Sequence, residues 1–182
     1  MTCGHYHIEP NAPNPMDVLI RPIQPTDDAP LARVIRETLA EFDADGDGFA
    51  GRDAEMQSLS RAYTRPRHAY FVAQRDDAVL GGVGVAPLAG GDADTAELRK
   101  MYLTADARGA GLGRRLLFRA IETARALGFR RIYLETLTDM RAARHLYEQA
   151  GFRHLARPMG NTGHHGCNSW LLLELDSPRK RD

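Results

Sequence analysis

The pattern of apolar and polar residues changes period several times along this chain. Residues 18–23 carry spaced apolar side chains and predict a first strand, which Pro22 places at the edge of a sheet. Helical spacing follows, because Thr26 or Asp27 can cap a helix that keeps one apolar stripe to about Phe42. The chain is therefore expected to begin with a strand and an amphipathic helix.

The next segments combine a short helix with a pair of strands. The pattern predicts a helix near 54–63 and two strands, 70–73 and 79–85, that form a hairpin with its turn at 76–77. The glycine-rich run 81–84 weakens the second of these strands, so we expect a bulge or a close backbone contact there.

The second half of the chain alternates strands and helices again. The predicted elements are a strand at 95–103, a helix with its apolar face at Leu112, Leu116, Leu117, Ala120, Ile121 and Ala124 and its end at Gly128, a strand around Ile132 and Leu134, a helix at 141–149 that stops at Gly151, and a last strand at 169–175. Such alternation predicts an α/β fold with one mixed sheet and helices on both faces.

Length and charge narrow the class of protein. The 182 residues, 43% of them apolar and 26% charged, suit one soluble domain with a real core. We expect that domain at 17–175, after an irregular N-terminal arm at 1–16 and before a basic C-terminal tail at 176–182. The formal net charge is zero, from 24 basic and 24 acidic residues, so no overall field favours nucleic acid or an anionic membrane.

Targeting signals and disulfides are not apparent in the sequence. No apolar run approaches the length that spans a bilayer, and the N-terminus has no hydrophobic signal core. Two cysteines, Cys3 and Cys167, make no disulfide framework. We therefore expect a protein of the reducing cytoplasm.

The most informative motif is Arg108-Gly109-Ala110-Gly111-Leu112-Gly113, which lies between a predicted strand and a predicted helix. Glycines there let the backbone approach a ligand, and the start of a helix adds unpaired N–H groups and a positive dipole end. The motif lacks the Gly-Lys-Ser/Thr end of a P-loop and the G-x-G-x-x-G spacing of a dinucleotide fingerprint. It predicts a site for a phosphorylated ligand, with a tight strand-to-helix turn as the alternative reading.

The residues around this motif resemble the GNAT family of N-acetyltransferases. Arg108, Gly111 and Gly113 match the family's acyl-CoA signature, Arg/Gln-x-x-Gly-x-Gly/Ala. Residues 98–103 (LRKMYL) look like its fourth strand, and 143–152 (ARHLYEQAGF) resemble the end of a later helix. The resemblance implies a central mixed, mostly antiparallel sheet with helices on both faces, in which the fourth and fifth strands splay apart to admit the pantetheine arm.

Membership of this family would make acetyl-CoA the co-substrate. Backbone N–H groups of the glycine motif would hold its pyrophosphate, and the strand before the motif would hold pantetheine and the thioester. The coenzyme-binding residues implied by the resemblance are Met101, Leu103, Arg108, Gly109, Ala110, Gly111, Leu112, Gly113 and Arg114. Met140 stands where many family members carry an asparagine that binds the coenzyme, so one polar contact is missing from the pattern.

Two residues are predicted to move protons. Tyr147 matches a tyrosine that serves the departing thiolate in resembling enzymes, although it can also be an ordinary core residue. Glu97 is the candidate base for the amine, because an ammonium cannot attack a thioester. On an ideal strand Glu97 would share a face with Met101 and Leu103, and its alternative role is an ion pair with Arg99.

The segment before the last strand supplies two further candidates. His164 and His165 precede Cys167 in a loop that could close the acceptor pocket, where a histidine can act as a base or contact substrate. Surface histidines are the alternative. We expect no metal, because the spacing of these residues with the Cys-x-His-x-His at 3–7 matches no zinc site. The acidic loop 43–54 lacks the final glutamate of a calcium loop.

Together these features predict an acetyl-CoA-dependent N-acetyltransferase that moves an acetyl group to a small-molecule or peptide amine by direct attack in a ternary complex. The alternatives are a catalytically silent acyl-CoA-binding regulatory module and, more remotely, a nucleotide-binding protein. A homodimer is an expectation from the family alone. The acceptor is not specified, because acceptor loops vary freely on one fold.

Overall fold

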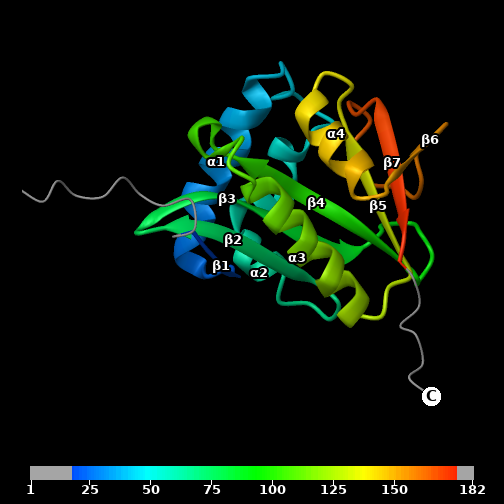
Figure 1. The fold of residues 1–182 in the computed structure, drawn as a ribbon, viewed down its shortest axis with the longest axis horizontal. Helices are drawn as coiled ribbons and strands as arrows, with labels where there is room; N and C mark the ends of the chain where they lie inside the picture. Colours follow the sequence, from blue (N-terminus) through cyan, green and yellow to red (C-terminus); the bar gives the residue numbers. More distant parts are fainter. Residues whose placement is uncertain (1–17, 176–182) are drawn as a thin grey trace, which may run out of the picture.

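Within residues 18–175, which the computed structural model describes, seven strands form one sheet in the order β1-β2-β3-β4-β5-β7-β6 (Figure 1). The predicted arm at 1–16 and basic tail at 176–182 lie outside the described residues. The elements are β1 Leu19–Pro22, η2 Pro25–Asp27, α1 Asp28–Ala40, η3 Ala50–Arg52, η4 Ala54–Gln57, α2 Leu59–Ala62, β2 Ala69–Arg75, β3 Ala78–Pro87, β4 Thr95–Leu103, η5 Ala105–Ala107, α3 Leu112–Ala126, β5 Arg131–Thr136, α4 Arg141–Gln149, β6 Arg153–Leu155 and β7 Ser169–Glu174.

The sheet is antiparallel except between its two central strands. β4 and β5 run parallel, and their pairing extends only from Thr95–Glu97 to Arg131–Tyr133. Both strands continue beyond this pairing, β4 to Leu103 and β5 to Thr136, so their carboxyl-terminal halves separate. The predicted mixed, mostly antiparallel sheet with splayed fourth and fifth strands is confirmed.

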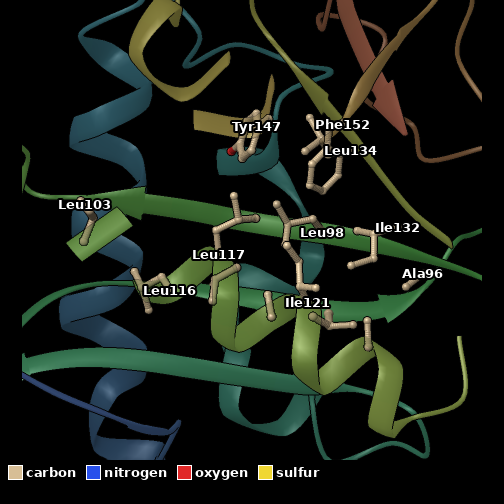
Figure 2. Packing of buried hydrophobic residues seen from close by; sticks show 14 of the residues in the cluster. Ala96, Leu98, Leu103, Leu116, Leu117, Ile121, Ile132, Leu134, Tyr147 and Phe152 are labelled. Atoms are coloured by element: carbon tan, nitrogen blue, oxygen red, sulfur yellow. The ribbon is translucent and has the colours of Figure 1, made fainter. Parts of the chain in front are cut away.

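Helices cover both faces of the sheet, as predicted. α3 crosses the front of the strands in Figure 1, whereas α1 and α2 lie behind them. Leu116, Leu117 and Ile121 of α3 pack on Leu98 of β4 and Leu134 of β5 in the main core (Figure 2). Burying each of these side chains contributes about 1.5–3 kcal/mol, so this face fixes α3 and the turn that precedes it.

The predicted helix at 54–63 is wrong in detail. Ser58 has φ −158° and separates the 3₁₀ turn η4 from the four-residue α2. The carboxylate of Asp28 at the start of α1 explains the break, because it accepts bonds from Ser58 Oγ (3.1 Å), Ser60 N–H (2.7 Å) and Ser60 Oγ (2.8 Å). This side-chain bonding competes with a continuous helix.

Two other features differ from the sequence pattern. Asp27 lies at the start of α1 but does not cap that helix, because its carboxylate instead binds the Arg21 guanidinium at 2.6 and 2.8 Å and accepts the Gln24 N–H at 2.8 Å. The strand β6 was not predicted, since three residues are too few to show an alternation. None of the helices within residues 18–175 combines the length and the apolar character that a bilayer crossing requires.

Candidate active site

Two glycines shape the turn before α3. Gly109 (φ +84°) and Gly111 (φ +79°) both adopt the left-handed conformation that side chains disfavour. A Cβ on either would meet no atom within 4 Å, so backbone conformation rather than space selects glycine. Gly111 is the N-cap of α3, and the helix ladder starts with Arg115 N–H donating to the Gly111 carbonyl. The earlier N–H groups of the helix start are those that lack intrahelical acceptors.

Arg108 ties this turn to the end of α1. Its Nε donates to the Leu103 carbonyl (3.0 Å), and its Nη1 and Nη2 donate to the Glu41 carboxylate (2.6 and 2.8 Å). The hydrogen bonds from Arg108 hold the pKa of the Glu41 carboxyl below its usual value. The Arg108 N–H is also used, since it donates to the Ala105 carbonyl. Contact between Arg108 and a coenzyme stays a prediction. The side chain of Arg114 is exposed at the start of α3, where a ligand can reach it.

A bulge in β4 divides its residues between the two faces of the sheet. The pairing with β3 shifts by one residue between Gly82 and Gly84, and Lys100 has φ +47°. The bulge predicted for the glycine-rich strand is a separate one: β3 has an extra residue, Leu80, against β2, and a Cβ on Gly81 would clash with the Tyr102 carbonyl oxygen. The face toward α3 carries Ala96, Leu98, Met101 and Leu103, and the opposite face carries Glu97, Arg99, Lys100 and Tyr102.

The prediction that Glu97 shares a face with Met101 and Leu103 is wrong, because the bulge at Lys100 breaks the alternation between them. Met101 and Leu103 instead meet the start of α3. A Cβ on Gly113 would lie 3.7 Å from Leu103 Cδ1 and 3.9 Å from Met101 Cε. The structure thus brings three of the predicted coenzyme-side residues together and sets Glu97 on the other side of the strand.

The opposite face of β4 carries a network of charges. Lys100 has a side chain only 1% exposed, and its ammonium contacts the carboxylates of Asp53 and Glu55. Arg99 donates from Nε to Glu97 Oε2 over 2.7 Å, and its Nη1 lies 3.6 Å from Glu55 Oε2. The ion pair between Glu97 and Arg99, the alternative role for this carboxylate, is confirmed, and its role as a base stays a prediction.

His164 connects the two ends of this network. Its Nε2 lies 3.0 Å from Asp53 Oδ2, and its Nδ1 lies 3.9 Å from Glu97 Oε1. Burial alone would lower the pKa of His164, but the hydrogen bond and charge of Asp53, with the charge of Glu97, raise it. Burial raises the pKa of Glu97, and the nearby cations of Arg99, His164 and Lys100 offset only part of that effect.

A cavity of about 60 Å³ lies where β4 and β5 separate, and residues from both faces of β4 line it. Its walls include Met101 from the coenzyme-side face and Glu97 from the opposite face. Tyr147 of α4 also lines it and packs beside Phe152, with Leu134 of β5 next to them in Figure 2. His164 lies in the wall, but His165 does not, because its ring packs over Gly48 in the acidic loop.

The sequence matches a known protein family and has a close relative in length and identity. The sequence model of the acetyltransferase (GNAT) family matches residues 34–152. An uncharacterized N-acetyltransferase of Escherichia coli K12, YjgM, is 40% identical over 88% of this chain and 97% of its own length. The chain belongs to the GNAT family of acetyltransferases.

Solved structures agree with this assignment at the level of the fold. A GNAT acetyltransferase of Staphylococcus aureus Mu50 superposes with a TM-score of 0.77 at 20% identity, over 86% of this chain and 98% of the other. The protein yncA of Salmonella typhimurium, solved with acetyl-CoA, superposes with a TM-score of 0.69 at 20% identity, over 91% and 98% of the two chains. Membership of GNAT makes this protein an acyltransferase by class.

In this GNAT protein, Tyr147 and Cys167 both line the cavity as protonated groups. Burial raises the pKa of Tyr147 above its usual value. Burial, helped by the charges of Glu135, Glu97 and Asp53, raises the pKa of Cys167 to about 12. At neutral pH the phenol therefore stays protonated, and the thiol is a poor nucleophile.

Four charged residues of this GNAT site were not among those predicted from the sequence: Asp53, Glu55, Lys100 and Glu135. Asp53 and Glu55 lie about 45 residues before the strand they contact, so only the fold brings them there. Two adjacent cations, Arg99 and Lys100, interrupt the alternation of apolar and polar residues in β4 and were a usable signal for a bulge. Among residues 18–175, no group of three or more His, Cys, Asp or Glu side chains is arranged to hold a metal ion.

Proposed function

We propose that this chain transfers the acetyl group of acetyl-CoA to a primary or secondary amine by direct attack in a ternary complex. The observation that carries the proposal is the cavity between β4 and β5, which brings Met101 of the coenzyme-side face, Glu97 of the opposite face and Tyr147 of α4 to one space. A donor and an acceptor bound on the two sides of the sheet would meet there.

The glycine turn fits the coenzyme. Gly109 and Gly111 leave open space where a side chain would stand, and the N–H groups of Leu112, Gly113 and Arg114 lie at the positive end of α3. These groups and the exposed Arg114 would hold the pyrophosphate, and the gap between β4 and β5 would admit the pantetheine arm. Bound acetyl-CoA supplies an activated acetyl thioester.

On the acceptor side, Glu97 is the proposed base. Its pKa is raised by burial, which brings it closer to neutral pH and makes it a better proton acceptor than an ordinary carboxylate. His164 lies between Glu97 and Asp53 and offers a route for the proton toward the loop. A role for His165 as a substrate contact stays a proposal with no support from its position over Gly48.

On the donor side, Tyr147 is the proposed acid. Its hydroxyl keeps its proton at neutral pH and is available to the departing thiolate. Direct transfer, without an acyl-enzyme, is supported by the raised pKa of Cys167, because a thiol that stays protonated does not compete with a free amine.

The test is a thiol-release assay with acetyl-CoA and a broad panel of amines, together with calorimetry of coenzyme binding. We expect acetyl-CoA to bind and at least one amine to release free thiol with saturable kinetics. Binding of the coenzyme without release of thiol for any amine would instead support the silent acyl-CoA-binding module. Failure to bind the coenzyme would refute both.

A further inference from the structure

An open, arginine-rich cleft lies next to the catalytic cavity, and we infer that it binds the carboxylate of the acceptor. Its walls include Arg61 and Arg65 from α2 and the following turn, His68 before β2, and Arg99 of β4. The inference rests on the proposed function and deepens it: the acceptor is an amine that also carries a carboxylate, as a free amino acid or ω-amino acid does.

The two outer arginines have unused donors. Arg61 and Arg65 are exposed, and neither side chain makes a hydrogen bond or ion pair with any other residue in 18–175. The lining includes one carboxylate, Glu55, which is already engaged by Lys100 and lies near Arg99. The cleft therefore holds an excess of cations, and the planar guanidinium with its paired donors matches a carboxylate.

Arg99 connects this cleft to the chemistry, because its side chain lines both the cleft and the catalytic cavity. On the cavity side it bonds to Glu97, the proposed base. A ligand with its carboxylate beside Arg61 and Arg65 would extend past Arg99 and present its other end to Glu97. The cavity end of this path is rich in carboxylates, which suits an ammonium group, so the site has the polarity of an amino acid.

The size of the cleft favours a small molecule. Its volume is about 690 Å³, within the roughly 300–1,000 Å³ that small-molecule sites usually have. A nucleic acid is a poor fit, because the formal net charge of the chain is zero and the basic residues here form one local cluster. A phosphorylated amine would also carry a negative charge, so the experiment must distinguish it from a carboxylated amine.

The test compares acceptors that differ only at the anion. Thiol release is measured for β-alanine, 4-aminobutyrate, glutamate and lysine, each beside its carboxamide, and for 2-aminoethylphosphonate. We expect kcat/KM for the best carboxylate to exceed that of its carboxamide by at least about tenfold. Equal use of acid and amide would overturn the inference while leaving the acetyltransferase activity intact, and so would a preference for the phosphonate.

The double variant Arg61→Ala/Arg65→Ala locates the effect. It should raise KM for carboxylated amines by about tenfold or more, with the KM for acetyl-CoA and the rates with carboxamides unchanged. Arg125→Ala, an exposed arginine on α3 outside this cleft, is the matched control and should change neither. A double variant that keeps the wild-type KM for every carboxylated amine would refute the assignment.

A binding measurement tests whether the cleft binds carboxylated amines, even if no amine is acetylated. Thermal unfolding is followed with CoA present and each carboxylated amine added in turn. A rise in Tm that the wild type shows and the double variant loses supports the cleft, since ligands that bind only the folded state stabilise it. No rise with any of them in the wild type overturns the inference, whereas absence of thiol release alone refutes only the proposed function.

Discussion

Replacing Glu97 by glutamine keeps the size of the side chain and removes the proposed base. Glu97 is 2% exposed, so few water molecules can take over its role. At pH 7 an amine with an ordinary lysine-like pKa of about 10.4 must lose its proton against about 3.4 pKa units, roughly 4.6 kcal/mol, whereas an α-amine near 7.8 faces only about 1 kcal/mol. The loss of activity should therefore depend on the pKa of the acceptor.

The assay is thiol release at saturating acetyl-CoA with two acceptors of different pKa. For a lysine-like acceptor, Glu97→Gln should lower kcat/KM by about 10²–10⁴-fold, and for an α-amine by clearly less. Because burial raises the pKa of Glu97, wild-type kcat/KM should rise as pH passes upward through that raised pKa. The variant should lose this limb and keep only the rise that follows deprotonation of the amine itself.

The matched control is Glu135→Gln. Glu135 lines the same cavity, but its Oε1 already accepts hydrogen bonds from Tyr133 (2.8 Å) and Thr162 (2.9 Å). We expect it to keep activity within a few-fold and to retain the pH limb. The reasoning about Glu97 would be refuted if the folded Glu97→Gln variant kept more than half of wild-type kcat/KM, or if both variants lost the same activity with both acceptors.

Three further changes test the site and its support. Tyr147→Phe should lower the single-turnover acetyl-transfer rate by about 10²-fold at an unchanged Kd for acetyl-CoA; an unchanged rate removes Tyr147 from the chemistry. Gly111→Ala, at φ +79°, should lose about 1–2 kcal/mol in urea unfolding and weaken acetyl-CoA binding, whereas Gly46→Ala, with open space and no left-handed φ, should do neither. Lys100→Met should lower the free energy of unfolding by about 1–3 kcal/mol at pH 7, because the half-buried carboxylates of Asp53 and Glu55 lose their ammonium partner and keep only His164 and Arg99. Burial would raise the pKa of Asp53, but His164 and Lys100 lower it, so the stability it contributes exists above about pH 3.9 and disappears in acid; equal losses at pH 7 and pH 3 would contradict the ion-pair explanation.

The sequence predicted most of the fold because most elements carry strong local signals. The α3 stripe from Leu112 to Ala124 is buried along its length, and Gly128 (φ +79°) ends the helix as expected. The strands of the central sheet and the hairpin turn at 76–77 also carry clear local signals and lie where they were predicted. The errors at Ser58 and in β6 come from a long-range hydrogen bond and from a strand too short to show a period.

The candidate site was predicted unevenly for the same physical reason. Gly111 and Tyr147 belong to local sequence motifs, so the adjacent residues were enough to predict them as candidates. Asp53 and Glu55 belong to no motif and reach the site only because the segment after α1 folds back over β4. The local sequence around a carboxylate in a polar loop does not indicate which residue it will contact, so these ion pairs are known only from the structure.

The bulge at Lys100 explains why Glu97 and Met101 lie on opposite faces of one strand. In a regular strand, Glu97, Arg99, Met101 and Leu103 would share a face, and the base would lie on the coenzyme side of the sheet. The extra residue reverses the alternation after Arg99, so Met101 and Leu103 turn toward α3 while Glu97 and Arg99 stay opposite. The same bulge shifts the strand beyond Arg99 by one residue, a local irregularity of the kind that re-aims side chains next to active sites. The left-handed φ of Lys100 is unfavourable for a residue with a Cβ, and the contacts of its ammonium with Asp53 and Glu55 stabilise it. These ion pairs therefore help to hold Met101 and Glu97 on opposite faces of β4.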